Sequence, residues 1–481
     1  MRSYETVIGL EVHVELATKS KIFCGCSTEF GGEPNTHVCP VCSGMPGTLP
    51  VLNKSVVEFA IAAGLALNCN ITQRCKFDRK NYFYPDLPKA YQISQLYLPI
   101  CRDGYVEIET QAGKKKIRIH EIHMEEDAGK LIHDPWDDCT LVDFNRCGVP
   151  LIEIVSEPDM RSAEEAVAYL EKLRLILQYL GVSDCKMQEG SMRADINLSV
   201  REVGSDKLGT RTEMKNMNSF KAIARAIEGE RKRQIELLES GKRVIQETRR
   251  WDDNKDTSFA MRTKEDAQDY RYFPEPDLPP VIIDDEWISS IKARQPELRD
   301  AKKLRYEKEF GLPAYDAAII TGSKHLADLF EETVALCNKP KEVSNWLMVE
   351  TLRLLKEKEM EPEEITYTPQ QLASIIKMVD EGRINRTVAK EVFEKVFCEG
   401  VDPEEYVKEH NLGLIADEEL LKEVIRRIIS ENPQSVADYK KGKVKAMGFI
   451  VGQTMREMKG KADPGRVNVI VKQMLDDDQQ T

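Results

Sequence analysis

TVIGLEVHVEL, residues 6–16, alternates apolar and polar side chains along most of its length. A period of two is typical of a β-strand whose two faces meet different surroundings. The polar members of the pattern are Glu11, His13 and Glu15. The stretch therefore predicts a strand that presents these three side chains on one face, although a strand with one face in solvent would show the same alternation.

Two further stretches repeat this pattern. In MRADINLSVR, residues 192–201, one face is predicted to carry Asp195, Asn197, Ser199 and Arg201. In TRTEMKN, residues 210–216, the shared face is predicted to carry Arg211, Glu213 and Lys215. Three strands would thus present carboxylates, an imidazole, an amide and bases.

Consecutive acids occur in HEIHMEEDAGK, residues 120–130, where Glu125, Glu126 and Asp127 follow His120 and His123. Such carboxylates repel one another unless cations neutralise them. Mg²⁺ prefers oxygen ligands and commonly binds together with nucleotide phosphates, so the pattern indicates phosphoryl transfer. The chain contains neither a P-loop motif nor a G-x-G-x-x-G motif that opens a helix, and we therefore expect ATP to bind on a sheet face.

Four cysteines form the strongest metal signal. Cys24-Gly-Cys26 is followed after twelve residues by Cys39-Pro-Val-Cys42. Four thiolates at this spacing can enclose a tetrahedral Zn²⁺ ion, and we predict a structural zinc site. Free buried cysteines are the alternative, and a catalytic cysteine is less favoured because no base stands at a defined spacing.

A proline-broken stretch, FDRKNYFYPDLPKAYQISQ, occupies residues 77–95. Its bases Arg79, Lys80 and Lys89 are interleaved with the aromatic residues Tyr82, Tyr84 and Tyr91. Aromatic faces with nearby bases can hold a nucleotide or an RNA end. Packing of half-buried loop side chains would account for the pattern equally well.

The 481 residues predict several domains, because single domains usually have about 100 to 200 residues. Short alternating strands dominate up to about residue 290 and helical periodicity dominates after residue 299, with the proline-rich FPEPDLPP, residues 273–280, between them. Helices are predicted to begin after Ser162, with a capping box to Glu165, and after Thr368. We predict an α+β chain with domains at residues 1–295, 296–405 and 406–481.

Composition excludes several classes of protein. Hydrophobic residues make up 41% and charged residues 31%, which is typical of globular domains. The N-terminus lacks the features of a secretory signal, and the longest apolar run, near residues 59–67, is too short to span a membrane. These features predict a cytoplasmic protein without a membrane segment.

The charge distribution is uneven. The formal net charge is −13, which argues against indiscriminate binding of nucleic acid. Residues 440–472, however, contain nine basic and two acidic side chains, a local net charge of +7. This tail can contact an RNA backbone, although a solvated helix face would have a similar composition.

Seven of these stretches resemble the GatB family in order and spacing, and the resemblance covers essentially the whole chain. They are VIGLEVHVEL, FDRKNYFYPDLPKAYQISQ, HMEEDAGK, PLIEIVSEPDMRS, EGSMRADINLSVR, EMKNMNSF and DYRYFPEPDLPP. The resemblance implies a cradle-shaped kinase domain with an antiparallel sheet similar to that of glutamine synthetase. An all-α helical domain and a small α-helical YqeY-like tail would follow.

The resemblance also implies a reaction. ATP would phosphorylate the side-chain carboxylate of Glu-tRNA(Gln), Asp-tRNA(Asn) or both, and ammonia would then displace phosphate to form the amide. A carboxylate is a poor electrophile, so it must gain a leaving group before an amine can attack. The implied cofactors are ATP, Mg²⁺ and structural Zn²⁺.

Site residues carried over from the family match this sequence as follows. Glu11 and His13 match Mg²⁺ ligands, and Glu125 or Glu126 matches an acidic ligand and ammonia gate. Lys80 and Tyr82 match a polar passage near the tRNA acceptor end, and strand parity together with the resemblance adds Asp195, Glu213 and Lys215 as catalytic. We expect Arg79, Tyr82 and Arg211 to contact the cofactor. The predicted tRNA contacts in the tail are Lys443, Lys445, Arg456, Lys459 and Lys461.

The chain lacks a Gly/Ser-rich amidase signature with its catalytic Ser and Lys, so it is not expected to produce its own ammonia. The family resemblance implies a heterotrimer with an amidase subunit, GatA, and a small subunit, GatC. Two alternatives are a free-standing ATP-dependent amide ligase and a zinc-containing tRNA-binding module without catalysis. The clustered carboxylates argue against a pure RNA binder.

Overall fold

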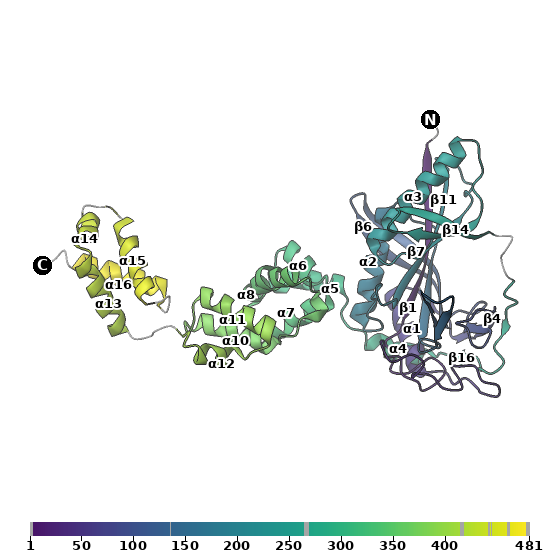
Figure 1. Cartoon of the computed structure of the whole chain (residues 1–481), viewed down its shortest axis with the longest axis horizontal. Coiled ribbons are helices and arrows are strands. Elements are labelled where there is room, and N and C mark those ends of the chain that lie inside the picture. The colour runs from purple at the N-terminus through teal and green to yellow at the C-terminus, as the bar shows by residue number, and fades with distance from the viewer. Residues whose placement is uncertain are drawn as a thin grey trace. The chain divides into compact units, whose positions relative to one another are not determined.

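The computed structural model describes residues 3–134, 136–263, 269–413, 418–440, 443, 445–458 and 462–477. The chain divides into two compact units, Met1–Leu298 and Arg299–Thr481 (Figure 1). The first unit combines a large, mostly antiparallel sheet with helices, and the second is helical. The α+β prediction is therefore confirmed.

A nine-stranded sheet forms the frame of the first unit, with β1 (Tyr4–Glu15) at its centre. Every neighbouring pair whose register is defined runs antiparallel except β12 with β13, which is parallel. The strand order is β14 (Thr257–Thr263), β13 (Glu247–Asp252), β12 (Thr212–Lys215), β11 (Met192–Glu202), β1, β10 (Pro150–Ser156), β7 (Gly113–Glu126), β6 (Cys101–Thr110) and β2 (Asn70–Ile71).

Helices cover one face of this sheet. The helices α1 (Lys54–Ala66), α2 (Ala163–Leu180) and α3 (Phe220–Glu239) contact β7, β6 and β11, respectively (Figure 1). Leu10, Val12 and Val14 of β1 are at most 1% exposed in the resulting core. Burial of these alternate residues directs Glu11, His13 and Glu15 away from the core, as the sequence predicts.

Three small sheets complete the first unit, together with the helix α4 (Asp285–Ala293). The proline-rich connector contributes only the two-residue strand β15, as expected for a segment with few backbone donors, and the two-residue strand β16 follows it. The small sheets are β15 (Phe273–Pro274) with β4 (Asp78–Asn81) and β5 (Tyr91–Ser94); β16 (Val281–Ile282) with β3 (Arg74–Cys75); and β8 (Lys130–His133) with β9 (Thr140–Asp143).

The second unit contains two separate hydrophobic cores. The first involves α5 (Arg299–Glu309), α6 (Ala314–Ile320), α7 (Lys324–Cys337), α8 (Pro340–Asn345), the π-helix η2 (Trp346–Thr351), α9 (Leu352–Lys358), α10 (Pro369–Asp380), α11 (Arg386–Glu399) and α12 (Pro403–Glu409). The 3₁₀ turn η3 (Pro362–Glu364) lies between α9 and α10 and has no buried residue. The second involves α13 (Glu418–Glu431), α14 (Pro433–Lys440), α15 (Lys445–Glu457) and α16 (Pro464–Asp477). None of the helices in the described ranges has the length and apolarity needed to cross a bilayer.

The helix starts predicted from sequence are present, with one difference in detail. Thr368 and Gln371 form a reciprocal capping box at α10. Ser162 caps α2 by accepting from the Glu165 N–H at 3.1 Å, but the Glu165 carboxylate accepts from the Arg161 N–H at 2.7 Å. Only half of the predicted box at α2 is therefore formed, because Glu165 is also held by Lys115 on β7.

The domain limits at 295/296 and 405/406 remain predictions. Val407 belongs to the first core of the second unit, so α12 packs with the helices that precede it. The second core begins at Leu421. A division between these two cores after α12 fits this packing better than one at residue 405.

The helix α3 fixes the positions of β11 and β12 through buried polar contacts. Glu230, which is 1% exposed, accepts hydrogen bonds from Thr212 Oγ1 on β12 at 2.8 Å and from Gln234 Nε2 at 2.8 Å. The Gln234 side chain also bonds the backbone of Leu198 and Val200 on β11. These contacts fix the position of β12, which carries Glu213 and Lys215, relative to β11 and α3.

We expect Glu230→Gln to destabilise the first unit by about 2 kcal/mol at pH 7, since a buried charge-assisted network loses its negative charge and one of its two acceptor oxygens. Burial alone would raise the pKa of Glu230, but hydrogen bonds from Arg233, Gln234 and Thr212 lower it. A lowered pKa stabilises the fold above pH 4.5 and loses that effect as the pH falls through the folded-state value. Urea unfolding at pH 7 and at about pH 3.5 should show the difference from wild type shrinking at the lower pH.

The matched control is Glu107→Gln, which removes an exposed carboxylate paired with Lys114 at 3.4 Å. Its effect should stay within about 0.5 kcal/mol at both pH values. Equal effects of Glu230→Gln at the two pH values would contradict the assignment of Glu230 as a stabilising anion.

Candidate active site on the sheet face

Strand register aligns polar side chains of five neighbouring strands on the face opposite the helices. His13 is opposite Glu153, and Glu153 is opposite His123. On the other side of β1, Glu11 is opposite Asp195. The resulting polar band comprises His123 and Glu125 on β7, Glu153 on β10, Glu11 and His13 on β1, Asp195 and Asn197 on β11, and Glu213 and Lys215 on β12.

The first cluster in the polar band surrounds His13. Its Nε2 lies 3.5 Å from Glu125 Oε1 and 3.4 Å from Glu153 Oε2. The Nε2 atom of His123 lies 2.9 Å from the same Glu153 oxygen. Ligand atoms of His13, Glu125 and Glu153 all lie within 4.8 Å of one another, a spacing that suits a single bound cation.

The second cluster lies on β1, β11 and β12, so the two clusters have β1 in common. Glu11, Asp195 and Glu213 also bring one carboxylate oxygen each to within 4.8 Å of one another. Asn197 Nδ2 donates to Glu11 Oε1 at 2.9 Å, and Lys215 pairs with both Asp195 and Glu213. The structure therefore brings together the residues predicted from three separate stretches of sequence.

Electrostatics of the polar band reflect an excess of carboxylates. Burial raises the pKa of Glu11, and the negative charge of Glu153 raises it further. Burial would lower the pKa of His13, but its hydrogen bond with Glu153 and the charges of Glu153 and Glu125 raise it. Both shifts indicate that added positive charge would stabilise the ionised carboxylates.

The polar band extends toward one end of β1 at Glu15. Burial and the neighbouring charge of Asp127 raise the pKa of Glu15 to about 8. Asp127 itself accepts from Arg193 at 2.9 Å and lies 3.5 Å from Arg146. Asp127, the third acid of the predicted acidic run, is therefore neutralised by arginines.

Glu126 lies on the other side of β7 from Glu125. Its carboxylate pairs with Lys89 Nζ at 2.5 Å and accepts from the Ile93 N–H at 3.0 Å. Successive residues of a strand face opposite sides, so Glu125 and Glu126 cannot enter the same cluster. The expected repulsion between consecutive acids is relieved by this separation and by Lys89.

The predicted cofactor contacts are placed in different surroundings. Arg79 forms a bidentate pair with Glu275, which is 3% exposed, and its guanidinium stacks over Tyr91 at 4.2 Å. This arrangement favours a structural role for Arg79 over contact with a nucleotide. Arg211 is exposed and precedes β12, which begins at Thr212, so it lies outside the strand predicted to carry it.

Lys80 and Tyr82 lie nearer the polar band. The ammonium of Lys80 lies over the rings of Tyr82 and Tyr270 at 5.8 Å and 4.9 Å, respectively. Burial raises the pKa of Tyr82, and the charges of Asp86 and Glu125 add to this. Within the described ranges Lys80 forms no ion pair, so its charge is available to an incoming anion.

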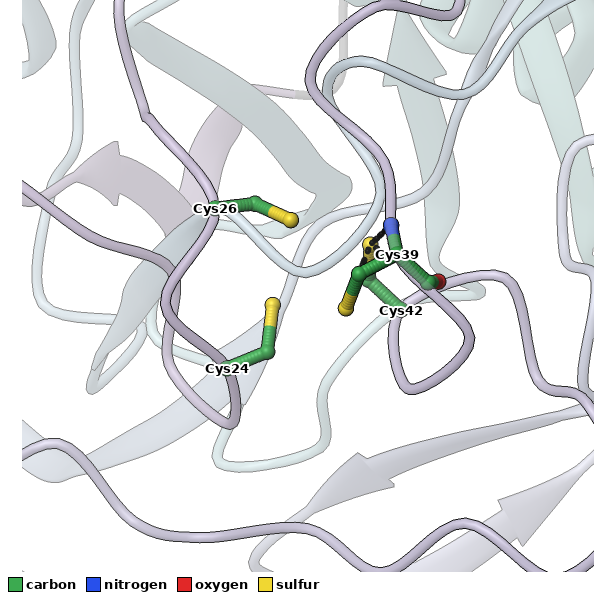
Figure 2. A group of neighbouring side chains, drawn as sticks. All are labelled: Cys24, Cys26, Cys39 and Cys42. Atoms are coloured by element: carbon green, nitrogen blue, oxygen red, sulfur yellow. Dashed lines mark hydrogen bonds between the residues drawn. The ribbon is translucent and has the colours of Figure 1, made fainter.

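The four cysteines converge as the spacing predicts (Figure 2). Their sulfur atoms lie within 4.8 Å of one another, and the sulfurs of Cys39 and Cys42 are 3.9 Å apart. Sulfurs of a tetrahedral zinc site are about 3.8 Å apart when Zn–S bonds are about 2.3 Å. The Cys39 N–H donates to Cys42 Sγ at 3.2 Å, which favours the thiolate of Cys42.

The thiols are electrostatically coupled. A hydrogen bond from Cys24 lowers the pKa of Cys42 to about 4, and the Cys39 N–H contributes to the same shift. Burial raises the pKa of Cys26 to about 11. A cavity of about 250 Å³ separates this cysteine cluster from Lys89 and Glu126.

Three of the predicted RNA contacts in the tail can be placed. Lys443, Lys445 and Arg456 are exposed, and Lys443 lies 3.1 Å from Asp438. Lys459 and Lys461 lie outside the described residues.

Sequence reasoning missed Glu153 as a site residue, although it lies at the centre of the polar band. The signal was present, because in PLIEIVS a single acid stands between Ile152 and Ile154, which are both fully buried. A single polar residue between apolar ones is too little to predict a site. Glu153 is recognised as a site residue only from the pairing of β10 with β1, which places it opposite His13.

Comparison with known proteins gives two matching family models. Residues 6–289 match the family described as GatB/GatE catalytic domain, and residues 328–475 match one described as GatB domain. Three curated relatives are each named as a subunit of aspartyl/glutamyl-tRNA(Asn/Gln) amidotransferase. The protein of Lachnoclostridium phytofermentans is 74% identical, with 99% of both chains covered. Those of Agathobacter rectalis and Caldicellulosiruptor bescii are 68% and 62% identical, with at least 98% of each chain covered.

Proposed function

The chain belongs to the GatB/GatE family, and from this we propose that it is the activating subunit of a tRNA-dependent amidotransferase. ATP phosphorylates the side-chain carboxylate of Glu-tRNA(Gln), Asp-tRNA(Asn) or both. Ammonia then attacks the acyl phosphate, phosphate leaves, and the amide of Gln-tRNA(Gln) or Asn-tRNA(Asn) remains. The observation that carries this proposal is the register that places five carboxylates and two histidines on one sheet face.

The donor set of the polar band fits Mg²⁺. One ion would be held by His13, Glu125 and Glu153, and another by Glu11, Asp195 and Glu213, where Mg²⁺ would neutralise the phosphates of ATP. Asn197 and Lys215 orient the second set by direct contact. We propose that this face is similar to that of glutamine synthetase, whose reaction also forms an amide from a carboxylate.

Substrate binding is assigned to residues beside the polar band. The Lys80 ammonium, which contacts only aromatic faces in the described ranges, can attract the substrate carboxylate. Tyr82 and Tyr270 provide surfaces on which an unpaired base of the acceptor end can stack. Arg79 instead holds this strand in place through Glu275.

The nitrogen must come from another chain. We propose that an amidase subunit releases ammonia from glutamine and that a small third subunit completes the complex. The cavity beside the cysteine cluster and the Lys89–Glu126 pair has both apolar and charged groups in its lining, and we propose that ammonia passes through it. Glu126 would act there, on the opposite side of β7 from the activating residues.

Variants of the polar band test the activation step. In the reconstituted complex with charged tRNA, glutamine and labelled ATP, Glu11→Ala, His13→Ala and Glu153→Gln should each reduce tRNA-dependent phosphate release by about 100-fold or more. The reason is that each removes a group that positions charge on the reacting phosphate. Glu107→Gln, on β6 and exposed, should leave the rate unchanged.

Three outcomes separate the hypotheses. Phosphate release that needs charged tRNA and is lost in the variants supports the proposal. Release without tRNA would favour a free-standing amide ligase, and no release at all would favour a binding module without catalysis. Unchanged thermal unfolding of the variants would show that the lost rate is not lost folding.

We propose that the cysteine cluster holds structural zinc. The purified chain should contain about one equivalent of zinc by mass spectrometry, and Cys39→Ser or Cys42→Ser should lose most of it. Cys398→Ser is the control, because Cys398 is exposed and lies in α11. Retention of zinc by the Cys42→Ser chain would show that the metal binds elsewhere.

The proposed tail domain, residues 406–481, supplies affinity for the tRNA backbone. Lys445→Glu together with Arg456→Glu should weaken binding of charged tRNA about tenfold at moderate salt and should reduce its salt dependence. Removing the chain after Gly413 should weaken binding further while glutamine hydrolysis changes little.

Lys395→Glu is the matched control for the tail, since Lys395 is a partly exposed residue of α11 and pairs with Glu399. It should change tRNA affinity by less than about twofold. Equal affinities of the truncated and complete chains would remove the tail from the binding surface.

A further inference from the structure

Lys21 has an unusual position beside the cysteine cluster. Its side chain is completely buried, with an exposed fraction of 0%. Its Nζ donates to the backbone oxygen of His37 at 2.7 Å and lies 3.5 Å from both the backbone oxygen of Phe144 and Cys42 Sγ. A single ammonium thus connects the cysteine loop with the segment that follows β9.

A buried ammonium needs a compensating negative charge, because burial of an unpaired ion is costly. Within the described ranges, no carboxylate lies within ion-pair distance of Lys21 Nζ. The two carbonyl oxygens satisfy hydrogen bonds but carry no net charge. Of the three groups in contact, only the sulfur of Cys42 can become a full anion.

The charge of a loaded cysteine cluster provides this anion. Four thiolates around one Zn²⁺ have a total charge of −2, and a hydrogen bond from a cation to a ligand sulfur spreads part of that charge. Lys21 Nζ lies at hydrogen-bond distance from one of the four sulfurs on the protein side of the cluster. The Cys39 N–H approaches the same sulfur, so Cys42 has two donors.

We propose that Lys21 is a positioning residue for the metal: its ammonium is the counter-ion of the zinc-loaded cysteine cluster and stabilises that state over the metal-free one. The inference rests on the proposed zinc site. Through His37 and Phe144, the same ammonium fixes the loaded loop to the body of the first unit. The spacing of the cysteines in the sequence does not predict this role of Lys21, and Lys21 is not part of the polar band.

Lys21→Met tests the proposal in the complete chain. Methionine keeps most of the side-chain volume but removes the charge. In competition with a chelator of known affinity, zinc binding should weaken about tenfold or more. Urea unfolding should show a larger loss of stability in the zinc-loaded chain than in the metal-stripped chain, because the ammonium faces a cluster with a total charge of −2 in the first and at most the Cys42 thiolate in the second.

Lys302→Met is the matched control. Lys302 is 8% exposed, and its Nζ lies 2.8 Å from a carboxylate oxygen of Glu331 in the second unit. This variant should lose stability equally with and without zinc, and its zinc affinity should equal that of wild type. The comparison of the two variants separates the loss of stability caused by removing any buried lysine from a specific effect on zinc binding.

Lys21→Gln provides a second variant if Lys21→Met does not fold. Its amide keeps a hydrogen-bond donor at this position but carries no charge, so zinc affinity should again fall about tenfold. In a Co²⁺-loaded chain, loss of the cation should also move the sulfur-to-metal charge-transfer band to longer wavelength. This readout does not depend on activity.

The outcomes distinguish this inference from the zinc proposal. A wild-type chain that binds no zinc overturns both. A wild-type chain that binds zinc, with a Lys21→Met or Lys21→Gln variant that binds it within about twofold, overturns only the role of Lys21. Equal destabilisation of the loaded and stripped chains would likewise show that Lys21 acts by packing alone.

Discussion

Pairing of β1 with β10 on one side and β11 on the other is the constraint on which the candidate site depends. In an antiparallel pair, directly opposed side chains share a face, and a slip of one residue exchanges the two faces. In this chain such a slip would place Glu11 and His13 in the core and expose Leu10 and Val12, which are at most 1% exposed. The hydrophobic core therefore fixes the register that brings the carboxylates together.

This constraint explains why much of the site could be predicted from local patterns. Alternation placed Glu11 and His13 on one face of a strand, and the same argument placed Asp195 and Glu213. Cysteine spacing predicted the cluster at residues 24–42. These features depend on short-range periodicity, which the sequence contains directly.

Other features depend on contacts between distant residues and could not be read from a single pattern. Glu275 lies 196 positions after Arg79, yet its carboxylate pairs with the Arg79 guanidinium, which was predicted to bind the cofactor. Glu153 became a site residue only through its register with His13. Strand geometry places Glu125 and Glu126 on opposite faces of β7. The sequence alone did not show which of the two belongs to the site, because both are carboxylates and either could bind a metal.

Two adjacent residues of β7, Glu125 and Glu126, have different surroundings. Glu125 faces His13 and the polar band, whereas Glu126 faces Lys89 and the cavity beside the cysteine cluster. The two residues are neighbours in a strand that is hydrogen-bonded to β10. A displacement of Glu126 by its partner Lys89 that shifts the β7 backbone would therefore also move Glu125.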